Sequence, residues 1–225
     1  MFLTICHLTL HDYLFYASRE MGRLYETEKY LHNYGLTYAL GLVASPYSNT
    51  SQVPRYQEDL RTLNEQGVYV TPAHPISYSY AFHTFKMANV NYYNFTPQIS
   101  SNQAVFGRAK ELAPQSTFEF FVISQAAIHL PHWIRLGKWM AKAQVATIAQ
   151  TSVQIKTGQG RINGALNPLD LPQRPQTCNI VAMAPASLIT NVHMNGEHYE
   201  ARIETTDYSD IIRLPAGMRY HAAHV

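Results

Sequence analysis

The sequence predicts one α+β domain, in which helices lie early in the chain and strands follow. A chain of 225 residues can bury the core of one domain. Hydrophobic residues make up 46% of it, which is typical of a globular protein. Helical spacing of apolar residues ends at Gly67, and runs with strand character dominate after it.

Two helices are expected before Gly67. The first begins near Thr27 and has one apolar face, made by Leu31, Tyr34, Tyr38 and Leu42. The second has Pro54 as its first residue, is amphipathic through Tyr56, Leu60 and Leu63, and ends at Gly67. The expected strands are Phe2–Leu10, Val68–Thr71, Ile76–Phe85, Thr117–Ser124, Val145–Ile155 and Asn179–Ala184.

A β-hairpin is predicted near the C-terminus. Asn195 and Gly196 separate two strand-like runs, and this dipeptide favours the two positive φ angles of a type I′ turn. Two other segments, Met87–Gln115 and Gly158–Pro175, are long and polar, and we expect them to be loops. Loops of this length in a compact domain are usually functional or disordered.

The composition indicates a chain of a reducing compartment. Cys6 and Cys178 are the only cysteines, and two distant cysteines make no disulfide framework. The apolar N-terminus has no basic region or cleavage site of a signal peptide, and no run reaches the ~18 residues of a membrane span. We therefore expect a cytoplasmic protein that contacts no membrane.

The charges are few and unevenly placed. Charged residues make up 14% of the chain, below the usual share of about 25%, which fits a surface covered by partners or one rich in uncharged Tyr and Gln. Between Gln66 and Leu169 there are two acids, Glu111 and Glu119, and eight bases. No acid occurs at 120–169. A basic, acid-free stretch suits a polyanion, although chance could also produce it in a charge-poor chain.

The segment Leu130–Lys142 is the strongest candidate for nucleic-acid contact. Its bases Arg135, Lys138 and Lys142 alternate with Trp133 and Trp139. On a turn around a glycine the bases could approach phosphates, and an indole ring could stack on a base. The alternative is an amphipathic helix with its Trp side chains in the core.

No catalytic or metal-binding motif was found. The phosphate-loop, dinucleotide-binding and nucleophile-elbow patterns are missing, and the pairs His129/His132 and His221/His224 lack further ligands. We expect no metal, no cofactor and no catalytic residues. A His with a nearby Lys or Tyr could still cut RNA without a metal.

Several segments form a specific set when they are read in order: Leu8–Asp12, Arg19–Glu28, Asn33–Leu42, Ile134–Trp139, Asn167–Pro172 and Leu214–Tyr220. Together they resemble the type I-D branch of the Cas-five family of CRISPR proteins. The resemblance runs nearly from end to end. The element Leu136-Gly137-Lys138 is similar to a short Leu-Gly-basic element that the wider family places near guide RNA.

The resemblance implies a ferredoxin-like, RRM-related (RAMP) core over residues 1–225, with a thumb inserted at 87–115 and a β-rich part at 176–225. It implies a non-catalytic subunit of the Cascade ribonucleoprotein complex of antiviral defence. Such a subunit caps the five-prime handle of the guide RNA and contacts the large and backbone subunits. It leaves open a contact with target DNA near the PAM end.

The residues expected to bind RNA come from the matching segments and from the basic stretch. They are Arg19, Arg23, Arg108, Lys110, Arg135, Lys138, Trp139, Lys142 and Arg161. Two other functions stay open: an endoribonuclease on the same fold that uses His129 or His132 to process repeat RNA, and a protein scaffold that touches no RNA.

Overall fold

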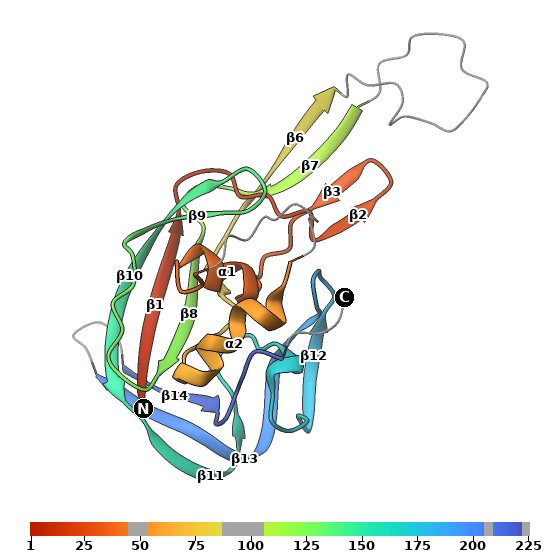
Figure 1. Ribbon diagram of the computed structural model, residues 1–225. Helices are drawn as coiled ribbons and strands as arrows, with labels where there is room; N and C mark the ends of the chain where they lie inside the picture. Colours follow the sequence, from red (N-terminus) through yellow and green to blue (C-terminus); the bar gives the residue numbers. More distant parts are fainter. Residues whose placement is uncertain (45–53, 87–105, 205–208, 222–225) are drawn as a thin grey trace.

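The computed structural model describes residues 1–44, 54–86, 106–204 and 209–221. Within these ranges the chain forms an α+β structure that is mostly β, with curled sheets and two α-helices (Figure 1). The helices are α1 (Asn33–Ala39) and α2 (Tyr56–Gln66). Neither is long and apolar enough to cross a membrane. The relation of this architecture to the ferredoxin-like core stays a prediction.

The central sheet has six strands in the order β4-β8-β1-β10-β9, with β5 also paired to β8. The strands are β1 (Phe2–Leu10), β4 (Tyr69–Val70), β5 (His74–Ser77), β8 (Thr117–Ser124), β9 (Trp133–Leu136) and β10 (Ala141–Ser152). The predictions at Phe2–Leu10 and Thr117–Ser124 are confirmed.

Two smaller sheets extend from the central one. The first contains β2 (Arg19–Met21), β3 (Leu24–Glu26), β7 (Phe106–Leu112) and β6 (Tyr80–Lys86), in that order. The second contains β11 (Gln154–Arg161), β13 (Leu188–Glu204), β12 (Thr177–Val181) and β14 (Ser209–Pro215), and the 3₁₀ helix η2 (Pro168–Asp170) precedes β12. Figure 1 shows β6 and β7 projecting from the body of the molecule.

The central sheet is buried on both faces, because the side chains that β1 directs to each of its two faces include apolar ones. Leu3 and Ile5 belong to a core shared with α2 and the C-terminal sheet, whereas Leu8 and Leu10 belong to a core on the opposite face. Strand β8 divides in the same way, with Phe121 facing the first core. Burial on both faces explains why these two strands are recognisable as apolar runs.

The first helix is shorter than predicted. It begins at Asn33, with the His32 side chain accepting a hydrogen bond from the Tyr34 amide. Upstream residues are extended, since Leu31 exchanges backbone hydrogen bonds with Ala73 and the Thr27 amide donates to Lys110. Pairing with distant strands therefore overrode the helical spacing. The second helix is confirmed, and Gly67 ends it in the left-handed conformation at φ 65°.

The predicted hairpin at Asn195-Gly196 is wrong. Strand β13 continues through both residues, which pair with Gln159 and Gly158 of β11. Neither Asn195 nor Gly196 has a positive φ angle. The ladder with β11 supplies hydrogen bonds that a tight turn would lose. It also places Gly158–Arg161 in a strand, which corrects the expectation of a loop there.

Part of the segment expected to be a thumb is also a strand. Strand β7 takes up 106–112 and pairs antiparallel with β6, whereas residues 87–105 lie outside the described ranges. The division into a core, a thumb and a β-rich C-terminal part stays a prediction.

A buried carboxylate joins segments that are far apart in sequence. Asp170 accepts hydrogen bonds from Asn33 Nδ2 (2.8 Å), Tyr69 Oη (2.9 Å), Tyr34 Oη (3.1 Å) and the His221 amide (2.8 Å). Burial raises the pKa of Asp170 to about 6, and these hydrogen bonds oppose a further rise. The folded state therefore holds this proton more tightly than the unfolded chain does.

The first prediction concerns the pH dependence of stability. The contribution of Asp170 is complete below its unfolded pKa of 3.8 and falls as pH rises through about 6. The loss should approach about 3 kcal/mol, at ~1.4 kcal/mol per unit. His32, whose pKa burial lowers to about 3, acts in the opposite direction. The quantity to measure is therefore the difference in unfolding free energy between wild type and Asp170→Asn, by urea denaturation across this range. A constant difference would contradict the prediction.

Candidate nucleic-acid interface

The segment that carries the three spaced bases is a β-hairpin, so the helical alternative is excluded. Strand β9 pairs antiparallel with β10, and residues 137–140 form the turn. Gly137 has a φ of 73° and Met140 a φ of 55°. Both Trp side chains are about half exposed, at 44% for Trp133 and 54% for Trp139.

Gly137 allows this turn to lie directly against the chain's own backbone. The Lys138 amide donates a hydrogen bond of 2.8 Å to the Phe15 carbonyl. A Cβ at Gly137 would lie 2.6 Å from the same carbonyl oxygen and 2.6 Å from Leu14 Cδ1. We expected the backbone at Gly137 to lie close to an anion. It lies instead against Phe15, in the segment that precedes β2.

The hairpin places two bases side by side. Arg135 and Lys142 are direct cross-strand partners. Like charges at such positions destabilise a sheet. Asp12 relieves part of the repulsion, at 3.8 Å from the Arg135 guanidinium, and the Lys142 ammonium lies 4.0 Å from the centre of the Trp133 ring. An anion bound over this pair would remove the remaining repulsion.

Trp139 is held open rather than buried. Its ring stacks on Phe15, with centroids 4.3 Å apart and planes at 24°. One face of the indole is therefore fixed, and the rest of the ring is available to a further flat group. Lys138, beside it, is exposed and forms no ion pair within the described residues. The turn thus offers a cation and an aromatic surface together.

Strands β3 and β7 bring a second set of bases together. They pair in parallel, and the Arg108 amide donates to the Arg23 carbonyl at 2.8 Å. Arg23 and Arg108 are exposed and lack carboxylate partners in the described part of the chain.

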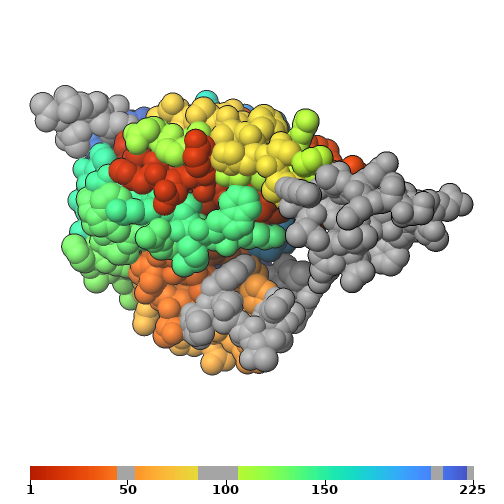
Figure 2. Space-filling model, turned by 90° about the horizontal axis from the view of Figure 1, so that it is seen from above, coloured from red at the N-terminus to blue at the C-terminus, as the bar shows by residue number. Residues whose placement is uncertain are grey.

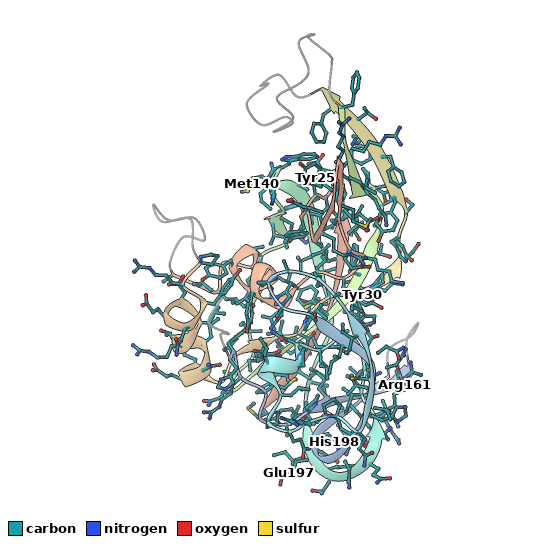
Figure 3. The ribbon with its side chains drawn as sticks, turned by 90° about the vertical axis from the view of Figure 1, so that its right-hand side faces the viewer. Tyr25, Tyr30, Met140, Arg161, Glu197 and His198 are labelled. Atoms are coloured by element: carbon teal, nitrogen blue, oxygen red, sulfur yellow. The ribbon has the colours of Figure 1, made fainter. Side chains whose placement is uncertain are left out.

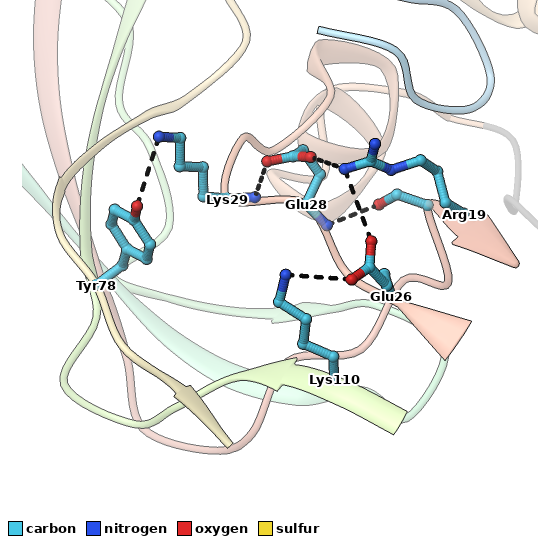
Figure 4. Close-up of polar contacts among 7 residues, drawn as sticks. Arg19, Glu26, Glu28, Lys29, Tyr78 and Lys110 are labelled. Carbon is cyan, nitrogen blue, oxygen red and sulfur yellow. Dashed lines mark hydrogen bonds and ion pairs between the residues drawn. The ribbon is translucent and has the colours of Figure 1, made fainter. Parts of the chain in front are cut away.

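Arg19 and Lys110 are already neutralised (Figure 4). The Arg19 guanidinium lies 2.7 Å from Glu28 and 3.7 Å from Glu26, and the Lys110 ammonium lies 3.4 Å from Glu26. Lys110 also lies 4.2 Å from the centre of the Tyr80 ring. These two bases hold the sheet together, which reduces what they can contribute to phosphate binding.

The β9–β10 hairpin and the sheet of β2, β3, β7 and β6 lie at the same end of the molecule. Figure 2, which looks down on that end, shows red residues from the N-terminal segment next to the yellow of β6 and the green of the β9–β10 region. Figure 3 places Met140 and Tyr25 at this end and Arg161 well away from them. The structure therefore brings the predicted bases together except for Arg161.

Two residues of this surface were missed by the sequence analysis. Asp12 belongs to one of the segments that match the family but was not predicted to contact a base, and no role was predicted for Phe15. Their roles depend on contacts with residues more than a hundred positions away, so no local pattern could have indicated them. In the described ranges, no group of three or more His, Cys, Asp or Glu side chains could hold a metal ion.

Comparison with known families decides the wider assignment. The family model for the type I-D CRISPR-associated protein Cas5/Csc1 matches residues 1–223. The chain belongs to this family. The resemblance found in the sequence is thereby confirmed, and the Cas5/Csc1 assignment supports a role in a CRISPR effector complex. No curated protein matches the chain.

The second prediction separates backbone strain at Gly137 from its contact with Phe15. Gly41 has a similar φ of 70°, and a Cβ added there would meet no atom within 4 Å, so Gly41→Ala should cost only the strain, about 1 kcal/mol. Gly137→Ala should cost about 1–3 kcal/mol more, because its methyl group would collide with Phe15. Chemical denaturation of both variants measures this. Equal costs would show that the turn does not rest on Phe15.

Proposed function

We propose that this chain is a non-catalytic RNA-binding subunit of the type I-D CRISPR effector complex, and that it caps the five-prime handle of the guide RNA in the cytoplasm. The β9–β10 hairpin is the main contact in this proposal. The supporting observation is the cross-strand pair of bases Arg135 and Lys142. Among the described carboxylates, only that of Asp12 offsets the repulsion between them. The half-exposed ring of Trp139 belongs to the same hairpin. A phosphate backbone supplies the missing negative charge.

The rest of the proposed interface follows the same end of the molecule. Arg23 and Arg108 extend the positive surface from the hairpin onto the sheet that contains β3 and β7. Contacts of this kind position RNA without reading its sequence. The large subunit and the backbone subunits are the proposed protein partners. They would cover other parts of the chain, whose overall share of charged residues is low. A contact with target DNA near the PAM end fits the same positive surface.

The third prediction tests the hairpin through the salt dependence of binding. If three phosphates are neutralised, replacing Arg135, Lys138 and Lys142 together with Ala should lower the slope of log K against log salt by about 2, at ~0.7 per phosphate. The loss should be similar for RNAs of different sequence. Fluorescence anisotropy with labelled guide RNA provides the measurement.

A control of equal charge keeps this test specific. Arg55, Arg61 and Arg174 are exposed and lie outside the proposed interface, so their triple Ala variant should keep most of the slope. A hairpin variant that melts like wild type and still binds with the wild-type affinity and slope would remove the hairpin from the interface. If the wild-type chain itself binds no guide RNA at any salt concentration, a scaffold without RNA contact is favoured.

The fourth prediction concerns the endoribonuclease alternative. His132 forms a hydrogen bond of 2.9 Å with Gln144, and His129 is exposed without a carboxylate partner in the described ranges. Metal-free cleavage of RNA needs both a general base and a general acid, and the amide of Gln144, the hydrogen-bond partner of His132, can serve as neither. We therefore expect repeat RNA to stay intact when it is incubated with the pure chain and a chelator. Cleavage that His129→Ala or His132→Ala abolishes would instead establish the nuclease.

A further inference from the structure

An open groove of about 700 Å³ lies on the flank of the molecule, away from the hairpin. Its walls come from residues 29–30, from the His74–Tyr78 segment with Glu119, and from the C-terminal sheet around Arg161. Figure 3 shows Tyr30 and Arg161 on the same side of the molecule, with Met140 on the other side and above them. The volume falls in the range of roughly 300–1,000 Å³ that is usual for ligand sites.

Two bases in this groove lack a carboxylate partner among the described side chains. The Lys29 ammonium donates to the neutral hydroxyl of Tyr78 at 3.4 Å, and this bond raises the pKa of Lys29 (Figure 4). The Arg161 guanidinium donates to the neutral amide oxygen of Asn191 at 3.1 Å. Neither base forms an ion pair within the described ranges. Arg213, by contrast, is paired with Glu200 at 2.9 Å.

The position of Arg161 depends on a distortion of the sheet. Thr177 is opposite His193 and Asn179 is opposite Thr190, so β13 has one extra residue there and forms a bulge. Asn191 lies in this bulge with a φ of 50°, and its side chain holds the Arg161 guanidinium. Asn is one of the few residues other than glycine that adopt such a φ readily, so the bulge is compatible with this side chain and directs it toward Arg161.

The groove also presents aromatic surface beside the charge. Tyr78 is 40% exposed, and the Lys29 ammonium lies 5.3 Å from the centre of its ring and 5.7 Å from that of Tyr30. Glu119, also on the lining, is buried and lies 3.4 Å from both His7 and His74. Burial lowers the pKa of His74, so this carboxylate keeps its charge and the phosphates must bind on the side of Lys29 and Arg161. Asp210, on the lining, accepts a hydrogen bond from the Ile211 amide. Two cations without carboxylate partners next to the exposed ring of Tyr78 match what single-stranded nucleic acid requires.

We propose that this groove is a second site, which binds a single-stranded polynucleotide. Its phosphates lie between Lys29 and Arg161, and a base stacks on Tyr78. The class of ligand rests on the proposed nucleic-acid role, but the site uses none of the hairpin residues. Either the guide RNA or a DNA strand supplies this chemistry.

The fifth prediction tests the groove with the pure full-length chain, a labelled oligouridylate and an oligothymidylate of equal length. The double variant Lys29→Ala/Arg161→Ala should lower the slope of log K against log salt by about 1.4, which is roughly a 25-fold loss of affinity near 0.1 M salt. Tyr78→Leu should weaken binding roughly fivefold or more at every salt concentration, because it removes the stacking surface. Tyr78→Phe, which keeps the ring, should keep that affinity.

Controls identify the source and isolate the groove. Arg55→Ala/Arg61→Ala removes the same charge from α2 and its start and should leave the slope near the wild-type value. A loss confined to the oligouridylate assigns the groove to RNA, one confined to the oligothymidylate assigns it to DNA, and equal losses assign it to either strand. A groove variant that matches this control with both probes overturns the inference.

The hairpin triple variant, measured in parallel, separates the two proposals. If only the hairpin variant loses affinity, the groove inference fails and the proposed function stands. If only the groove variant loses affinity, the groove stands and the hairpin interface fails.

Discussion

The arrangement of the described chain depends on the buried carboxylate of Asp170. It accepts hydrogen bonds from α1, from β4 and from the backbone near the C-terminus. A buried carboxylate is tolerated only where donors surround it, so these segments can pack only in the arrangement that supplies them all. Asp170 thereby ties η2 and the segment after β14 to α1 and to β4 of the central sheet.

Local patterns were sufficient for elements that local forces determine. Strands β1 and β8 and helix α2 were predicted because their apolar residues, together with Gly67 at the helix end, form patterns that can be recognised before their distant partners are known. The prediction at Asn195-Gly196 failed because β11 pairs across that dipeptide and keeps it extended. The early start predicted for α1 failed similarly, since Leu31 pairs with Ala73. Contacts between distant segments decided both cases.

The candidate interface was likewise predictable only in the features that follow from local spacing. The spacing of Arg135, Lys138 and Lys142 indicated a cluster, and the hairpin provides one. No spacing could show that Glu26 neutralises Lys110, because the parallel pairing of β3 with β7 brings these two together. Arg19 reaches Glu26 through the local pairing of β2 with β3. The distance of Arg161 from the other bases likewise follows from the topology. Composition and spacing identify the charges, and the sheets decide which of them stay available to a ligand.

The paired charges of Arg135 and Lys142 have a consequence for the life of the protein in a cell. An anion that binds the folded hairpin and not the unfolded chain stabilises the fold by mass action. Without such an anion the repulsion persists, and the hairpin opens more often. Proteases act on transiently opened segments. The hairpin is thus expected to be cleaved by a protease more readily in the free chain than in a chain with an anion bound there.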